Sequence, residues 1–203
     1  MCDFGLISFG LADKYRIPVI IAADGFIGQM MEPVDFPKPV KVLPEKPWAV
    51  KGTAETRLNV ISSIELDFDD LERHNIKLQK KYAIIEEEEV RYEEYRTDDA
   101  EIILVCYGIA SRVVQSTIDN LRAEGVRAGM FRPITLFPFP SKRINQLSDT
   151  ANHFLSVEMS NGQMYDDIRL SVEGKKPVHL LSRYGGNVPT INEIHAKVIK
   201  IMR

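Results

Sequence analysis

The chain has 203 residues, of which 44% are hydrophobic and 27% charged, and its formal net charge is −3. These values are typical of a water-soluble globular protein and exclude a basic surface for nucleic acid or an anionic membrane. No apolar run approaches the roughly 20 residues that span a bilayer, and the N-terminus lacks the basic segment of a signal peptide. The two cysteines, Cys2 and Cys106, are too few for an iron–sulfur cluster and fit a reducing compartment. We expect a cytoplasmic protein.

The first 32 residues predict one helix and one strand. Residues 4–14 have the pattern of an amphipathic helix that ends before Pro18, and Val19–Ala23 is a β-prone run that ends at the turn pair Asp24-Gly25. A single helix and a single strand cannot bury their own apolar surface. They are either the tail of a larger α/β domain or elements that dock on the domain that follows.

A proline-rich linker and a charged helix come next. The linker prolines that precede Trp48 predict a stiff, extended segment, and we expect the tryptophan to be its packing anchor. These prolines are Pro33, Pro37, Pro39, Pro44 and Pro47. Asp69–Arg96 is predicted to be one long helix, with an apolar side formed by Leu78, Tyr82, Ile85 and Tyr92. Its acidic remainder is either a solvated face or an arm that reaches a partner subunit.

The stretch from Ile102 to Phe131 predicts a strand–helix–strand unit. Ile102–Tyr107 reads as a strand buried on both faces, and Gly108 provides the turn that follows it. Ser111 is expected to cap a helix that stops at Gly125, and Val126–Phe131 to form the next strand. Such units build parallel sheets.

The rest of the chain continues the alternation of strands and helices. Ser141–Leu147 predicts a short helix, His153–Val157 a strand, and 164–172 a helix that stops at Gly174. Pro177–Leu181 predicts a last strand, and Thr190 with Glu193 forms a capping box for a terminal helix. This order predicts an α/β domain over residues 98–203, with three layers and a mostly parallel sheet.

Three polar turns follow the predicted strands, and in a parallel sheet they share the carboxyl edge where ligands bind. The candidate residues are Gly108, Ser111, Asn161, Gln163, Gly185 and Gly186, with Arg132 and Arg183 as cations and Glu158 as a carboxylate. They predict an anion or coenzyme A site, a subunit interface, or turns with no ligand.

Glu158 is interpreted as an anion at a helix N-terminus. It is also a candidate partner for Arg132 across adjacent strand ends, the alternative being that Arg132 points into solvent. The histidines lack metal-ligand spacing, and no catalytic set is recognisable, so we predict no metal site and assign no catalytic residue.

Five segments together resemble the alpha subunit of 2-oxoacid:ferredoxin oxidoreductases. They are ADKYRIPVI (12–20), ADGFIGQMMEP (23–33), FRPITLFPFP (131–140), VEMSNGQM (157–164) and RYGG (183–186). The charged region through Glu93, Glu94 and Tyr95 is most similar to the branch that acts on branched-chain 2-oxoacids such as 2-oxoisovalerate.

The resemblance implies a domain organisation. Residues 1–32 would be the C-terminal remnant of a thiamine pyrimidine-binding domain, and 33–97 the proline-rich linker with the charged helix. Residues 98–203 would be a transketolase C-terminal-like domain. The glutamate with which the family activates thiamine has no counterpart in this sequence, so we expect the isolated chain to be inactive and to bind no cofactor alone.

The implied function is oxidative decarboxylation of a 2-oxoacid to acyl-CoA with reduction of ferredoxin. Thiamine diphosphate, magnesium, iron–sulfur clusters and coenzyme A would be held by other domains and by beta, gamma and ferredoxin-like delta subunits. This chain would be the architectural half of the alpha subunit. One alternative is a non-catalytic interaction module, which could also bind a second copy of itself. The other is a free-standing nucleotide- or CoA-binding α/β domain.

Overall fold

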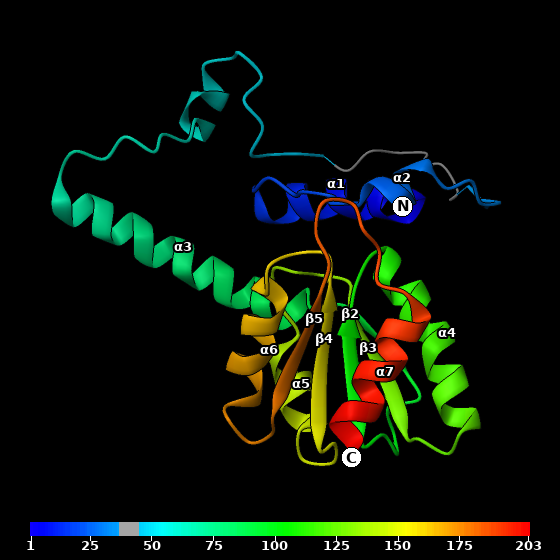
Figure 1. Cartoon of the computed structure of the whole chain (residues 1–203). Helices are drawn as coiled ribbons and strands as arrows, with labels where there is room; N and C mark the ends of the chain where they lie inside the picture. Colours follow the sequence, from blue (N-terminus) through cyan, green and yellow to red (C-terminus); the bar gives the residue numbers. More distant parts are fainter. Residues whose placement is uncertain (37–44) are drawn as a thin grey trace. The chain divides into compact units, whose positions relative to one another are not determined.

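The computed structural model describes residues 1–36 and 45–203 and divides into two compact units. The first unit contains residues 1–22 and the described residues between 31 and 84. The second contains residues 23–30 and 85–203 and holds the sheet (Figure 1). The segment 23–30 therefore belongs to the second unit, although the chain on both sides of it belongs to the first.

The second unit is built on a five-stranded sheet in the order β1-β3-β2-β4-β5. Its strands are β1 (Tyr92–Tyr95), β2 (Ile102–Cys106), β3 (Ala128–Pro133), β4 (His153–Glu158) and β5 (Val178–Ser182). The last four run parallel, and β1 joins the edge antiparallel to β3. The mostly parallel sheet predicted from the sequence is confirmed.

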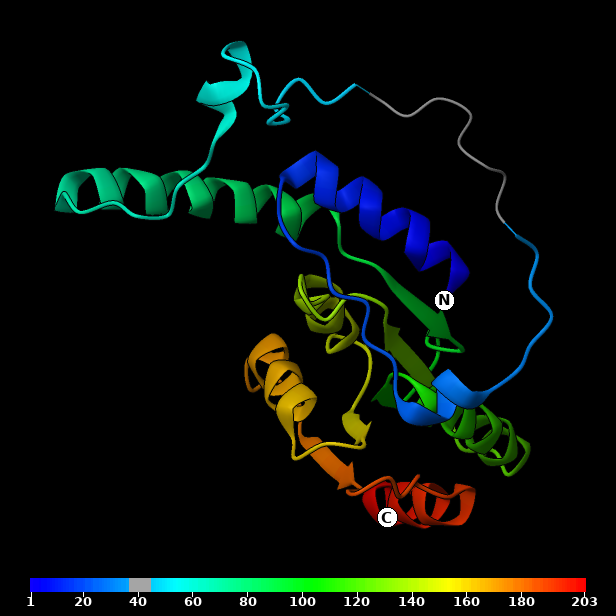
Figure 2. The same cartoon turned by 90° about the horizontal axis from the view of Figure 1, so that it is seen from above.

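Two helices cover each face of this sheet. Helices α4 (Ile109–Ala123) and α7 (Ile191–Met202) pack on one face, and α5 (Ser141–Leu147) and α6 (Gln163–Val172) on the other (Figure 2). Residues of β2 alternate between the two cores, with Leu104 facing α4 and α7 and Val105 facing α5 and α6. Every residue of β2 is buried, which explains why its sequence is a continuous apolar run. The two helix layers and the sheet between them confirm the three-layer prediction.

The two helix starts that the sequence singled out differ in outcome. Thr190 and Glu193 form the predicted capping box of α7. The predicted cap of α4 is wrong, because the helix already begins at Ile109 and Ser111 lies inside its first turn. The Ser111 hydroxyl donates to the Gly108 carbonyl at 2.7 Å, and the N-cap of α4 has no side-chain hydrogen bond.

The long charged helix is shorter than predicted. Helix α3 runs from Phe68 to Glu88, and Tyr92–Tyr95 is strand β1 instead of its last turn. The tyrosine that begins β1 stacks on Phe131 of β3, with ring centroids 5.0 Å apart. Tyr92–Tyr95 is a strand because it pairs with β3, some 40 positions later in the chain. The local sequence pattern does not show this distant partner.

The N-terminal elements match the sequence in part. Helix α1 (Cys2–Tyr15) ends where predicted, with Arg16 in the left-handed conformation. Val19–Ala23 was expected to be a strand, which is wrong: the structure gives it no regular conformation, and no strand within residues 1–36 or 45–203 pairs with it. The short helix α2 (Gly25–Gln29) follows it.

The predicted linker is described only in part, because Pro37, Pro39 and Pro44 lie outside the described residues. Trp48 is half-buried, and the Arg16 guanidinium lies 4.8 Å from the centre of its ring, which fits a packing role. A 3-10 turn, η1 (Glu55–Asn59), follows. No helix in the described part of the chain combines the length and apolar character needed to cross a membrane.

Candidate functional site

The three predicted turns do meet at one edge of the second unit. They follow β2, β4 and β5, which are parallel, so all three lie at the carboxyl edge of the sheet (Figure 1). The second and third turns are joined directly, because the Tyr184 hydroxyl donates to the Asn161 side-chain oxygen at 3.3 Å. The same hydroxyl shares a hydrogen bond of 2.9 Å with that of Ser182.

Glu158 ends β4 and is fully enclosed, with 1% of its surface exposed. Its carboxylate accepts from the hydroxyls of Ser156 at 2.9 Å and Ser160 at 2.5 Å, and from the backbone N–H of Met164 at 3.4 Å and Tyr165 at 3.1 Å. The two N–H groups belong to the first turn of α6. The predicted role of Glu158 as the anion at a helix N-terminus is confirmed.

Arg132 does not reach Glu158, so the predicted clamp between these residues is wrong. The physical reason is the strand order, since β2 lies between β3, which carries Arg132, and β4, which carries Glu158. Arg132 instead binds Glu93 on β1, the residue opposite it in the antiparallel pair, with Nη2 2.6 Å from the carboxylate. The alternative of an Arg132 free in solvent is also excluded.

The other predicted residues occupy the turns. Arg183 forms an ion pair with Glu193 in the first turn of α7. Gly185 and Gly186 have φ angles of 62° and 84°, a backbone conformation that residues other than glycine rarely adopt. Gln163 begins α6 and is exposed, while Ser111 is buried in α4.

A residue that the sequence did not place at this edge is Asp24. Its Oδ2 accepts from the Ile109 N–H at 2.8 Å, at the start of α4. Sequence analysis read Asp24-Gly25 only as a turn pair, and its aspartate–glycine pattern does not show a partner 85 positions away. The carboxylate stands where a helix cap or a bound anion would stand in other proteins.

The electrostatics of the edge follow from these contacts. The N-termini of α4 and α6 each hold a carboxylate of the chain itself, from Asp24 and Glu158, and both nearby arginines pair with acids. Within the described residues no group of three or more metal-ligating side chains occurs. Cys106 is buried below the edge, and burial raises the pKa of its thiol far above its usual range, which makes it a poor nucleophile.

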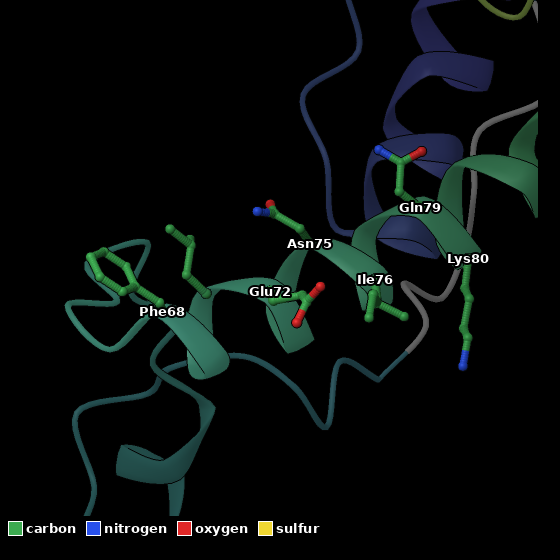
Figure 3. A pocket seen from close by; sticks show the side chains of 7 residues that line it. Phe68, Glu72, Asn75, Ile76, Gln79 and Lys80 are labelled. Carbon is green, nitrogen blue, oxygen red and sulfur yellow. The ribbon is translucent and has the colours of Figure 1, made fainter.

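A hollow also runs along the exposed part of α3 in the first unit (Figure 3). Its lining comes entirely from this one helix, namely Phe68, Leu71, Glu72, Asn75, Ile76, Gln79 and Lys80. Because one helix supplies every lining residue, the hollow is an open trough on the helix surface and encloses no ligand space.

Comparison with known proteins identifies relatives along the whole chain. Residues 100–194 match the family described as pyruvate:ferredoxin oxidoreductase core domain II. The ketoisovalerate oxidoreductase subunit VorB of Methanothermobacter marburgensis is 53% identical over 99% of this chain, which covers 57% of that protein. The 2-oxoglutarate synthase subunit KorA of Methanocaldococcus jannaschii is 30% identical over 98% of this chain, with 60% of its own length covered. The chain thus spans somewhat more than half the length of these relatives.

A solved structure agrees in fold. The 2-oxoglutarate:ferredoxin oxidoreductase of Magnetococcus marinus matches 68% of this chain and 24% of its own, with a TM-score of 0.61 and 20% identity. This structural similarity supports the fold, and the sequence identities to VorB and KorA support homology. The chain is therefore similar, along its whole length, to subunits of 2-oxoacid oxidoreductases, and residues 100–194 match the core domain II model of pyruvate:ferredoxin oxidoreductase.

Proposed function

We propose that this chain is part of the alpha subunit of an oxidoreductase that converts a branched-chain 2-oxoacid to its acyl-CoA and reduces ferredoxin. One observation carries the proposal, namely 53% identity to a ketoisovalerate oxidoreductase subunit over 99% of the chain. The identity to a 2-oxoglutarate synthase subunit is 30% over a similar length. The difference favours a branched-chain substrate over a dicarboxylic one.

Within such an enzyme, the role of this chain is architectural. The carboxyl edge of the sheet carries polar turns, and the Glu158 carboxylate at this edge is enclosed and already accepts from two hydroxyls and two backbone N–H groups. The N-termini of α4 and α6 at this edge hold Asp24 and Glu158, and these carboxylates would repel a phosphate group placed there. The residues of the described chain therefore do not fit a diphosphate with its magnesium ion.

We accordingly place thiamine diphosphate, magnesium, iron–sulfur clusters and coenzyme A on other parts of the enzyme. The partners would be a beta subunit that binds thiamine diphosphate, a gamma subunit and a ferredoxin-like delta subunit, all in the cytoplasm. The exposed residues of the edge, such as Asn161, Gln163 and Tyr184, then serve a subunit interface. A free-standing nucleotide- or CoA-binding module gains no support from helix N-termini that already hold carboxylates.

The domain organisation remains a prediction. We infer a remnant of a pyrimidine-binding domain in residues 1–32, a linker with the charged helix in 33–97, and a transketolase C-terminal-like domain in 98–203. The match of residues 100–194 to core domain II supports the third part. Residues 23–30 share a compact unit with residues 85–203, which supports a junction between the inferred domains in this segment.

Two measurements on one tagged chain test the proposal. The chain purified from its own cells is expected to bring down a polypeptide that holds thiamine diphosphate, whereas the chain purified alone is expected to bind the cofactor no better than about millimolar. Isothermal titration with thiamine diphosphate and magnesium measures both preparations. Micromolar binding by the isolated chain would contradict the architectural role, and recovery of the chain without a cofactor-binding partner would contradict the subunit assignment.

A further inference from the structure

We propose that Asp24 anchors the segment 23–30 to the α/β unit by holding the first turns of two helices with one carboxylate. Its Oδ1 accepts from the Ile27 N–H of α2 at 2.9 Å, and its Oδ2 accepts from the Ile109 N–H of α4 at 2.8 Å. The two helices are far apart in the sequence. This anchoring role goes beyond the proposed function and does not depend on it.

Helix α4 needs this outside acceptor because it has no side-chain cap of its own. Its N-cap position is Gly108, which carries no side chain, and the Ser111 hydroxyl donates to the Gly108 carbonyl. The first backbone N–H groups of a helix have no partner within the helix. A carboxylate between two helix N-termini also interacts favourably with the positive end of each helix dipole. Aspartate offers two acceptors on a short side chain, whereas serine offers one oxygen.

Gly108 and Asp24 depend on each other. A Cβ added to Gly108 would lie 2.4 Å from Asp24 Oδ2, closer than real Cβ atoms approach any atom. The backbone of Gly108 also has a φ of 62°, which favours glycine by itself. The glycine therefore serves two purposes, since it permits the turn and it leaves room for the carboxylate.

The contact lies where the chain passes between the two compact units. Residues 1–22 and 31–84 belong to the first unit, so two of the three points where the chain passes between the units lie at the ends of the segment that Asp24 holds. Phe26 and Met30 in this segment have 46% and 43% of their surface exposed. Without Asp24, we expect the segment 23–30 to detach while the sheet remains folded.

A double-mutant cycle tests the contact. In Gly108→Ala the new methyl group strains the backbone and displaces the carboxylate, but in an Asp24→Ala background only the backbone strain remains. The combined loss is therefore expected to be smaller than the sum, by about fivefold or more in the unfolding equilibrium constant measured with urea. Gly125→Ala is the matched control, because Gly125 has a φ of 86° and open space around its Cβ. Its effect is expected to add to that of Asp24→Ala.

Hydrogen exchange separates local anchoring from a general loss of stability. In Asp24→Ala and Asp24→Asn, the amides of Ile27 and Ile109 and of the segment 23–30 are expected to exchange at least about tenfold faster, while those of β2 and β4 are unchanged. Asp35→Asn, at an exposed aspartate, is the control and leaves the pattern unaltered. If 23–30 keeps its protection in both variants, or if the cycle is additive, the anchor does not exist. Should Gly108→Ala fail to fold, the exchange experiment decides alone.

Discussion

Arg132 on β3 lies directly opposite Glu93 on β1, and its guanidinium contacts the glutamate through both Nε, at 3.0 Å, and Nη2, at 2.6 Å. The pair links the side chains of the antiparallel edge strand and its neighbour, which are already joined by strand pairing. Its side chains are 34% and 55% exposed, so solvent screens the attraction between them.

The first prediction concerns the strength of this pair. Arg132→Met and Glu93→Gln are expected to show a coupling of about 0.2 to 1 kcal/mol in a double-mutant cycle, because exposed ion pairs contribute little. Arg132→Met and Glu158→Gln should add without coupling, since β2 lies between their strands. Urea denaturation of the single and double variants measures both. Coupling between Arg132 and Glu158 would contradict the strand order.

Glu158 is expected to matter far more than the surface pair. Glu158→Gln places an amide group against donors that now share a carboxylate, so a buried donor loses its partner, at a cost of roughly 1 to 3 kcal/mol. The control is Glu173→Gln, an exposed position at the end of α6, which should change stability by less than about 0.5 kcal/mol. Thermal unfolding compares the two. Equal effects would show that the buried network contributes nothing.

The elements with strong local patterns were predictable from the sequence. The run Ile102–Cys106 is apolar because both of its faces are buried, and Thr190 with Glu193 caps α7 through neighbouring residues. Two of the errors arose where distant residues decide the outcome. Strand β1 forms by pairing with β3, and Val19–Ala23 lacks a partner strand within the described residues.

The candidate site shows the same division. Glu158 was placed correctly because the end of a strand and the helix after it are adjacent in the sequence. The partner of Arg132 was wrong because the order of strands in a sheet is not written in any single segment. The contact of Asp24 with Ile109 joins residues 85 positions apart, and no spacing rule finds it.

The environment of Glu94 leads us to expect that the stability of the fold falls at acidic pH. Arg143 donates to both of its oxygens, at 2.6 and 3.0 Å, and these hydrogen bonds hold the pKa of Glu94 below its usual value. A carboxyl with a lowered folded-state pKa contributes stability above its unfolded value of about 4.5, and this stability is lost as the pH falls through the folded value. Arg143→Gln should flatten the pH profile below about pH 4.5 in urea unfolding.

The control for that profile is Arg169→Gln. Arg169 pairs with Asp166 one turn away on the solvent-facing side of α6, with both side chains more than half exposed. Its removal should leave the slope of stability against pH unchanged, because exposed pairs contribute little. If Arg143→Gln and Arg169→Gln give the same profile as the unaltered chain, Glu94 is not stabilised by Arg143.

His179 predicts a second pH dependence, nearer neutrality. Burial is the largest cause that lowers the pKa of His179. The positive charges of His153 and Lys197 lower this pKa further, and the rings of His153 and His179 have centroids 5.7 Å apart. Because the unfolded chain then binds more protons, stability should be complete above about pH 6.5 and fall as the pH drops below it. His179→Phe should weaken this dependence below about pH 6.5, and His74→Gln should not. A steeper dependence in His179→Phe would contradict the assignment.

The subunit assignment is tested most directly by the activity of the complex that contains this chain. The complex, purified through a tag on the chain, is assayed for reduction of a viologen dye with 2-oxoisovalerate, 2-oxoglutarate or pyruvate, each with and without coenzyme A. The proposed function predicts CoA-dependent reduction, with kcat/KM for 2-oxoisovalerate at least about tenfold above that for the other two acids. A complex that reduces the dye with none of them would contradict the assignment, and one that prefers 2-oxoglutarate or pyruvate would contradict the branched-chain substrate.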